Sequence, residues 1–424
     1  MIKYIYNIQQ YVFKIIKRDV FMKKLLSVLL ALAMVCSFAA CSSSNSSQTT
    51  ETTVSSQSET SAETVSTEDN KEKLEWVDYT EYNLEEDVPA KNVILMIGDG
   101  MGKNIIKASE IVKGDKLVMS GMKYRTDVTT YSQSVTNGYA KFTDSAASAT
   151  AMSTGYKTLN GCVGVDPDGN KLETICEYAQ SFDMETGLVA RQVVSHATPA
   201  GMVAHNSSRD NYPQILREMV KANVNVMFGG GSQYYTNPKV KKTIDDNKYK
   251  YITKVDELEA LNKDDDKVLG MFAYDNMGAP DMAPSLTKMT SKALDMLDND
   301  KGFFLMVEGS NIDTYESKCD METTLGQMQD FDKAVDYVLE WAEKHPGTLV
   351  IVTADHETGG VTLPDNPKPE DINDSCFTSD GEHTNTDVWL FASGAQSKEL
   401  CKKDVIDNTD IAKYMRKVIE DSHE

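Results

Sequence analysis

The sequence predicts an α/β fold, doubly wound, with a mostly parallel central sheet and helices on both faces. Short, continuously apolar runs recur along the chain between helical stretches, at 92–100, 302–313, 348–360 and 387–394. Strands without polar alternation are typical of a parallel sheet that is covered on both faces. Three of these runs end in acids or in an Asp-His pair. Because ligands bind at the carboxyl ends of strands in such folds, these ends predict a site.

Helices are expected between the strands, and the stretch 323–344 shows the pattern most clearly. Its apolar residues recur every three or four positions and share one face: Leu325, Met328, Phe331, Val335, Val338 and Leu339. This spacing is typical of an amphipathic helix that packs against a core.

Residues 1–41 indicate an upstream extension, 1–21, followed by a lipoprotein signal peptide. A basic start at 22–24 precedes an apolar run at 25–35, and two alanines stand before Cys41. These small residues resemble a bacterial lipobox, whose cysteine is lipidated after cleavage. We therefore expect an exported, cell-envelope lipoprotein, on the outer face of the cytoplasmic membrane or in the periplasm, anchored to the membrane through a lipidated Cys41. A plain signal peptide or an uncleaved anchor stays open, although the run is short for a membrane span.

The rest of the chain divides into a flexible tether at 42–83 and a single folded domain at 84–424. The first part of the tether, about thirty residues after Cys41, is rich in Ser, Thr and Glu and has hardly an apolar residue, so it cannot bury a core. The net charge of −22 argues against nucleic-acid binding, because phosphate backbones are bound by basic patches. An exported domain can form a disulfide, and Cys162–Cys176 is the first candidate pair, although the pairing stays open at this point.

Asp99 is the first candidate ligand, in the stretch IGDGMG at the end of the first strand. The glycines do not match the spacing of a dinucleotide-binding or Walker loop. An acid in a backbone cradle would also repel phosphate, so Asp99 makes better sense as a metal ligand. A simple strand-to-helix turn is the alternative.

The stretch TDSAASAT at 143–150 combines an acid and serines with other small side chains. One interpretation is a well-capped, closely packed helix, because Asp and Ser are good N-caps and Ala is the best helix former. The other is that Ser145 is a nucleophile, since a helix N-terminus favours its alkoxide and any phosphate it carries. These eight residues alone leave both interpretations open.

Further acids and imidazoles stand at the other strand ends. Asp355 and His356 are adjacent in TADHETGG and are ligand types that suit zinc. His383 stands before the last strand, and Glu308 and Asp313 end the run VEGSNID.

The stretch SHATPAGMVAHNSSRD at 195–210 supplies three further candidates. His196 and Thr198 offer contacts to a metal or to water, and Arg209 offers a planar fork for two phosphate oxygens. A lone arginine after a turn is normally a surface residue, so the case for Arg209 depends on the other motifs. Three remaining histidines are expected to be structural or surface residues: His205, His345 and His423.

Together these motifs resemble the alkaline phosphatase family. IGDGMG, TDSAASATA, HATPA, VEGSNID, TADHETGG and EHT occur in that family's order and span residues 92–394. The resemblance implies the fold of that family and a metal-dependent phosphomonoesterase. It further implies two Zn²⁺ ions, one Mg²⁺ ion, small phosphate monoesters as substrates and a phosphoserine intermediate. A homodimer is one oligomeric state that the resemblance allows.

The resemblance also implies a role for each candidate residue. Ser145 is similar to the nucleophile, and Arg209 is similar to the phosphate clamp. Asp99, Asp355 and His356 correspond to ligands of the zinc that activates the nucleophile, and Asp99 also bridges to the magnesium.

The magnesium site is the first place where the chain departs from the family pattern. Thr198 and Glu308 correspond to its remaining protein ligands. His196 stands near them, where many bacterial members carry aspartate. This difference predicts looser magnesium binding, with zinc competing for the site.

The second zinc site is the other departure. Asp313 and His383 correspond to two of its ligands, but Ser317 stands where the family places a third, a histidine. A hydroxyl is a poor zinc ligand, so we expect weaker metal binding there. Glu316, Asp320 or water are the alternatives for the third position.

The leading interpretation is therefore an exported, lipid-anchored phosphomonoesterase of broad substrate range. A phosphodiesterase or sulfatase of the wider superfamily is a second interpretation, although the sulfatase motif is absent. The third belongs to a different class: a catalytically weak phosphate- or metal-binding lipoprotein, which the replacement at Ser317 favours.

Overall fold

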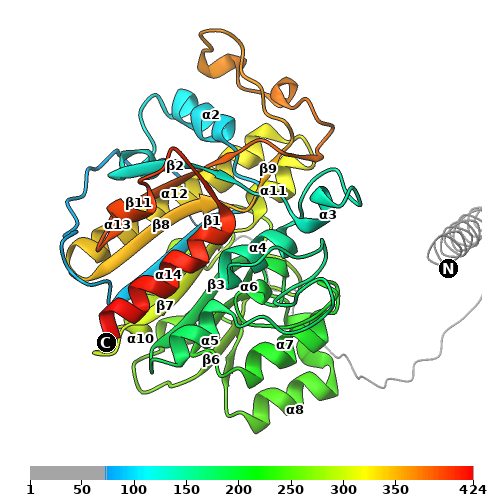
Figure 1. Cartoon of the computed structure of the whole chain (residues 1–424), viewed down its shortest axis with the longest axis vertical. Coiled ribbons are helices and arrows are strands. Elements are labelled where there is room, and N and C mark those ends of the chain that lie inside the picture. The colour runs from blue at the N-terminus through cyan, green and yellow to red at the C-terminus, as the bar shows by residue number, and fades with distance from the viewer. Residues whose placement is uncertain (1–71, 73, 424) are drawn as a thin grey trace, which may run out of the picture. The chain divides into compact units, whose positions relative to one another are not determined.

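The structure, a computed structural model, describes Glu72 and residues 74–423 (Figure 1). The predicted signal peptide, Cys41 and most of the predicted tether lie outside these described residues. Within them, no helix combines the length and the apolar character that crossing a membrane requires.

A central sheet of ten strands runs through the domain. In chain order its strands are β1 (Asn92–Gly98), β2 (Tyr124–Thr129), β3 (Glu185–Val193), β4 (Val226–Gly230), β5 (Lys250–Ile252), β6 (Val268–Met271), β7 (Phe303–Gly309), β8 (Thr348–Ala354), β11 (Val388–Gly394) and β12 (Val405–Asp407). They are arranged in the order β12-β2-β11-β8-β1-β7-β3-β4-β6-β5. A separate two-stranded sheet pairs β9 (Glu357–Thr358) with β10 (His383–Thr384).

The central sheet is mostly parallel, as the sequence predicts. β1, β7 and β8 are buried along their whole length, which explains their continuously apolar sequences. β11 is the exception in direction, because it runs antiparallel to both of its neighbours, β2 and β8.

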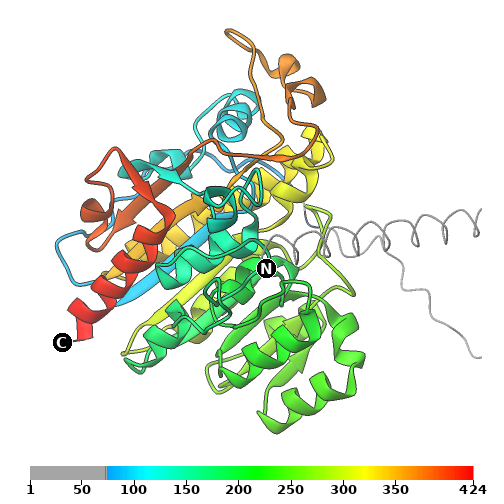
Figure 2. The ribbon, with the colours of Figure 1, turned by 45° about the vertical axis from the view of Figure 1, so that its right-hand side comes forward.

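Helices cover both faces of the sheet (Figures 1 and 2). One face carries a group that packs together and faces the viewer in Figure 1: α4 (Ser145–Thr154), α5 (Ile175–Gln180), α6 (Ala197–Gly201) and α14 (Asn408–His423). The opposite face carries α2 (Lys103–Lys113), α10 (Leu286–Leu297), α11 (Asn311–Glu316) and α12 (Met321–Glu343). The remaining helices of the described residues are α3 (Gln133–Thr136), α7 (Tyr212–Lys221), α8 (Pro238–Asp246), α9 (Val255–Glu259), α13 (Ser397–Leu400) and the short 3₁₀ turns Met119–Gly121, Ser232–Thr236, Pro369–Asp371 and Asp374–Cys376.

α12 is the helix that the sequence predicts at 323–344. Five of its six predicted core residues are buried, and Leu325 is partly buried against the same core. Asp320 caps the helix by accepting a 3.0 Å hydrogen bond from the Thr323 N–H.

The extended segment 74–83 lies against the domain. Tyr82 Oη donates a 2.6 Å hydrogen bond to Asp336, and Trp76 and Val77 are partly buried against the core. The packed chain therefore begins earlier than the predicted boundary at residue 84, because these aromatic and apolar side chains have surface to bury.

The expected disulfide Cys162–Cys176 is wrong, because every cysteine in the described part of the chain is free. Cys176 is buried on α5 within the core. The Cys162 Sγ atom instead lies 3.7 Å from the carbonyl oxygen of Ser207.

Candidate functional site

Three neighbouring strands bring the predicted acids together at one edge of the sheet. β1 pairs in parallel with β7 and β8, and the register sets Glu308 and Ala354 beside the last two residues of β1. Asp99 and Asp355, each the first residue after its strand, therefore stand at the same level. All three carboxylates are buried.

His383 reaches the same edge because it stands shortly before β11, which runs in the opposite direction to the parallel strands. Because β11 is antiparallel to β8, the start of β11 lies at the carboxyl edge of the parallel strands. The imidazole of His383 stacks on that of His356, with ring centroids 3.6 Å apart. His383 Nε2 also lies 3.3 Å from Asp313 Oδ1.

Three adjoining groups of side chains are placed to hold metal ions. Within each group the ligand atoms lie within 4.8 Å of one another: Asp99, Asp355 and His356; Asp313, His356 and His383; Asp99, His196 and Glu308. Asp99 and His356 each belong to two groups, so the three positions are contiguous. Thr198 is buried on α6, two residues after His196.

Unpartnered buried atoms support the assignment of this cluster to metal ions. Asp99 Oδ1, Asp355 Oδ2, Glu308 Oε1 and Thr198 Oγ1 are buried and have no hydrogen-bond partner among the described residues. Two of these atoms, Asp99 Oδ1 and Asp355 Oδ2, do lie near His356 Nε2, at 3.6 and 3.2 Å. A buried polar atom without a partner costs free energy, and gathered carboxylates repel one another. Divalent cations would remove both costs. Carboxylate and imidazole ligands suit zinc, whereas carboxylate and hydroxyl oxygens suit magnesium.

The electrostatics of Asp99 and Glu308 show how unfavourable these two carboxylates are as buried charges. Burial, and then repulsion from Asp355, raise the pKa of Asp99 well above its ordinary value. Burial raises the pKa of Glu308 to about 7. A cation that binds here must therefore compete with protons.

The second group instead forms an ion pair. Although burial opposes both shifts, the hydrogen bond between Asp313 and His383 lowers the pKa of Asp313 and raises the pKa of His383 to about 9. A metal ion that binds His383 therefore displaces a proton from this pair.

Ser145 is the first residue of α4. The carboxylate of Asp144 accepts a 3.0 Å hydrogen bond from the Ala147 N–H and caps the helix. Ser145 is 3% exposed, and its Oγ lies 3.3 Å from His356 Nε2. The stretch is thus a well-capped helix that also presents its first serine to a metal-ligand group.

The small residues of α4 allow a close helix–helix approach. A side chain at Gly201 of α6 would come within 2.8 Å of Ala149 Cβ. Small side chains in this stretch therefore serve packing between α4 and α6, in line with the interpretation of a closely packed helix.

Arg209 lies beside the cap of α4. Its Nη1 donates a 3.1 Å hydrogen bond to Asp144 Oδ2, and its Nη2 lies 3.3 Å from His196 Nε2. The same Asp144 oxygen accepts a 2.8 Å hydrogen bond from the Gly161 N–H. The structure thus brings the predicted arginine next to the predicted serine.

The replacements considered for the missing histidine differ in their surroundings. Ser317 follows α11 and is exposed, and the Asp320 side chain is engaged as the cap of α12. Glu316 is fully buried and close to Asp313, because its Oε2 and the Asp313 Cβ lie 2.8 and 2.9 Å from where a Gly100 side chain would begin. Both oxygens of its carboxylate lack a hydrogen-bond partner among the described residues. His356 completes the group with Asp313 and His383, and Glu316 stays an alternative ligand.

Thr358 is a site residue that sequence reasoning missed. Its buried hydroxyl donates a 2.7 Å hydrogen bond to Asp313 Oδ1 and lies 3.2 Å from His356 Nδ1. The position depends on the pairing of β9 with β10, which no local pattern reveals. The other three histidines make hydrogen bonds away from the site: His205 with Gly164 and Glu177, His345 with Trp341, and His423 with Ile419 and Lys301.

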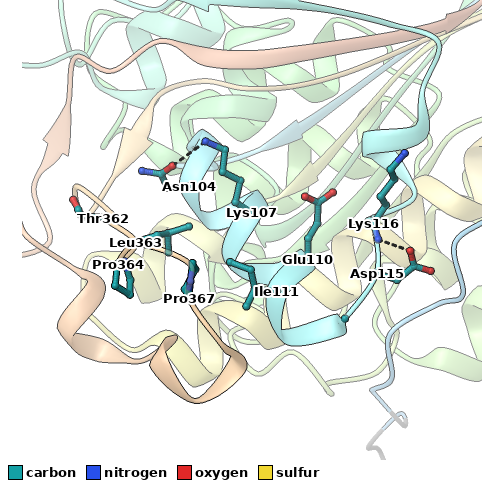
Figure 3. A pocket seen from close by; sticks show the side chains of 11 residues that line it. Asn104, Lys107, Glu110, Ile111, Asp115, Lys116, Thr362, Leu363, Pro364 and Pro367 are labelled. Atoms are coloured by element: carbon teal, nitrogen blue, oxygen red, sulfur yellow. Dashed lines mark hydrogen bonds between the residues drawn. The ribbon is translucent and has the colours of Figure 1, made fainter.

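A groove of 790 Å³ lies between α2 and the segment 362–367 (Figure 3). Lys107, Ile111 and Lys116 line one side, and Leu363 is among the residues of the other. None of the metal-ligand residues, and neither Ser145 nor Arg209, lines this groove. It is a surface feature separate from the candidate site.

Comparisons with known proteins identify the family of the chain. The family model described as "Alkaline phosphatase" matches residues 90–376. Alkaline phosphatase 4 of Bacillus subtilis is 37% identical over 66% of this chain and 64% of its own length. The alkaline phosphatase of Escherichia coli is 30% identical over 78% of this chain and 86% of its own length. The chain thus spans less than two thirds of the Bacillus protein.

Solved structures show the same fold. The alkaline phosphatase from the Antarctic bacterium TAB5 superposes with a TM-score of 0.71 and 31% identity, over 78% of this chain and 99% of that one. A cold-active alkaline phosphatase from the psychrophile Shewanella sp. superposes with a TM-score of 0.70 and 30% identity, over 77% and 99%. From the strand-end cluster, the family match and these superpositions, we conclude that the chain belongs to the alkaline phosphatase family.

Proposed function

We propose that the protein hydrolyses phosphate monoesters through a phosphoserine at Ser145. One observation carries the proposal: Ser145 Oγ lies 3.3 Å from His356 Nε2, within a metal-ligand group at the edge of the sheet. Relatives named alkaline phosphatases support the reaction class.

The three ligand groups suit two zinc ions and one magnesium ion. Asp99, Asp355 and His356 would hold the zinc beside Ser145, and Asp313 and His383 would hold the second. Asp99, Thr198 and Glu308 would hold the magnesium, with His196 standing beside them. When bound, such ions stabilise the entering and leaving oxygens of an in-line displacement and favour ionised hydroxyl and water oxygens.

Arg209 supplies the contacts to the phosphate. A guanidinium has five N–H donors, and two of them are directed at Asp144 and His196. The donors that remain can bind two phosphate oxygens side by side. The carboxylate of Asp144 fixes the guanidinium without consuming this capacity.

α4 contributes the field of its N-terminus. Its peptide dipoles point their positive end at Ser145, which favours both an ionised hydroxyl and a phosphate on that oxygen. Because these contacts recognise the phosphate rather than the rest of the ester, we propose a broad range of monoester substrates.

Turnover of p-nitrophenyl phosphate with added zinc and magnesium tests this function. Ser145→Ala should lower the rate on the order of a thousandfold or more, because the nucleophile is lost. Ser181→Ala, at an exposed serine on the surface, is the matched control and should leave the rate unchanged. A wild-type protein that binds phosphate without turning the ester over would be a binding protein, and faster turnover of a diester would indicate a phosphodiesterase.

A further inference from the structure

Three stacked rings stand behind Arg209. The imidazole of His196 lies against the ring of Tyr212, with centroids 6.2 Å apart and planes 12° apart. The other partner of Tyr212 is Tyr234, at 5.5 Å and 27°. His196 is also one of the two side chains that hold the guanidinium of Arg209.

The contact between His196 and Arg209 depends on the plane of the imidazole. A guanidinium only donates hydrogen bonds, so Nε2 must accept in the ring plane. The N···N distance of 3.3 Å is at the long end for such a bond, so a modest rotation of the ring breaks it. The second side-chain torsion of histidine is intrinsically broad, so a neighbour has to fix the plane.

Tyr212 is well placed to be that neighbour. It stands three residues after Arg209 and opens α7, whose first turn contains a proline. Arg209 itself is fixed through its N–H, which donates a 2.7 Å hydrogen bond to the Gly161 carbonyl. The short segment 209–212 therefore carries both the guanidinium of Arg209 and the aromatic ring that packs on His196, the hydrogen-bond partner of that guanidinium.

Tyr234 is fixed as firmly on the far side of the stack. The turn Ser232–Thr236 follows Gly231, which adopts the left-handed conformation at φ 99°. A side chain at Gly231 would also come within 2.7 Å of Val193 Cγ1. Backbone hydrogen bonds from Gly231 to Ala273 and Asp275 anchor the start of this turn.

We propose that Tyr212 is a positioning residue for phosphate binding. Its ring packs on Tyr234 and fixes the plane of the His196 imidazole. The guanidinium of Arg209 then keeps its hydrogen bonds to His196 and Asp144 and stays in position to bind phosphate. The proposal rests on the proposed role of Arg209 as the phosphate clamp. The stacked face rather than the hydroxyl carries this role, so phenylalanine should replace Tyr212 without loss.

The test measures binding of inorganic phosphate to the zinc- and magnesium-loaded protein by titration calorimetry, with KM and kcat measured in parallel. Tyr212→Leu should weaken phosphate binding about fivefold and raise KM more than it lowers kcat, given the usual strength of an aromatic pair. Tyr212→Phe should restore wild-type affinity. Tyr234→Leu, a second variant, should also weaken phosphate binding, but by a smaller factor than Tyr212→Leu.

Tyr251→Leu is the matched control. It removes the stack of Tyr251 on Tyr235, whose centroids lie 4.0 Å apart, and should lower thermal stability without changing phosphate affinity. In an Arg209→Ala background, Tyr212→Leu should have no further effect, because its influence passes through the guanidinium.

Two results would overturn the inference while leaving the proposed function intact. One is a loss of phosphate affinity in Arg209→Ala with none in Tyr212→Leu. The other is an undiminished effect of Tyr212→Leu when Arg209 is absent. By contrast, unchanged phosphate affinity in Arg209→Ala would show that Arg209 is not the phosphate clamp. That result would overturn this inference and the proposed role of Arg209, whereas hydrolysis through Ser145 is tested separately by Ser145→Ala.

Discussion

The hydroxyl of Thr358 donates a 2.7 Å hydrogen bond to Asp313 Oδ1. The same hydroxyl lies 3.2 Å from His356 Nδ1, on the other ring nitrogen from the one that faces Ser145. One small side chain therefore orients ligands of two adjoining metal groups. Outer partners of this kind set the direction and basicity of metal ligands.

Replacing Thr358 by valine keeps the shape of the side chain and removes the hydroxyl. We expect zinc affinity to fall about 10- to 100-fold, the usual effect of losing such a partner. Thr358→Ser, which keeps the hydroxyl, should stay close to wild type. Competition with a zinc chelator measures both, and equal affinity in the valine variant would show that the hydroxyl has no orienting role.

Restoring an imidazole at position 317 should strengthen the second zinc site. Ser317 stands four residues after Asp313, on the same side of the helical turn, and its N–H donates to the Asp313 carbonyl. In Ser317→His we expect zinc to bind at least about tenfold more tightly at this position. Metal analysis after dialysis checks this. Two tightly held zinc ions per chain in the wild type, unchanged by the substitution, would contradict it.

His196→Asp should favour magnesium at the third group. An imidazole suits zinc better than magnesium, whereas a carboxylate oxygen suits magnesium. We expect magnesium affinity to rise about tenfold, which corresponds to about 1.4 kcal/mol. Magnesium titration with zinc held constant measures this change. Equal affinity in the two proteins would mean that His196 does not limit magnesium binding.

The ion pair between His205 and Glu177 predicts a pH window of stability away from the site. Their side chains lie 2.9 Å apart. Burial opposes both shifts, yet the pairing raises the pKa of His205 above 6.5 and lowers the pKa of Glu177 from 4.5 to about 2. The contribution of His205 to the free energy of unfolding is full below pH 6.5 and is lost as the pH rises through its raised pKa. That of Glu177 is full above pH 4.5 and is lost as the pH falls towards about 2.

Glu177→Gln should therefore lower Tm most between pH 4.5 and 6.5 and less at higher pH. Because Glu177 is partly exposed, we expect only about 1–2 °C. Asp246→Asn removes an exposed pair with Lys242 and serves as the control, with no such window. A loss of Tm that stays constant up to pH 10 would exclude the charge pair as its cause.

Continuous apolar runs made the sheet predictable. β1, β7 and β8 are covered on both faces, and burial of this kind leaves a direct mark on the sequence. The antiparallel direction of β11 was not predictable in this way, because the direction of a strand depends on the path of the connecting segments and not on its own apolar sequence. The expected disulfide failed for a similar reason, since sequence shows which cysteines exist but not which of them meet.

The predicted site residues come together because strand ends define a common edge. Asp99, Glu308 and Asp355 needed only the order of the strands to become neighbours. Thr358 and Tyr212 were not predictable, because their roles depend on side-chain contacts between distant segments. Thr358 looks like any polar residue of a turn, and Tyr212 like any aromatic residue at a helix start.

The most direct test of the account is to trap phosphate on the protein. Wild-type, zinc-loaded protein incubated with a phosphomonoester and quenched in acid should carry one phosphate on Ser145, located by peptide mass spectrometry, and Ser145→Ala should carry none. Full turnover by Ser145→Ala, or phosphate found reproducibly on another residue, would contradict the central claim.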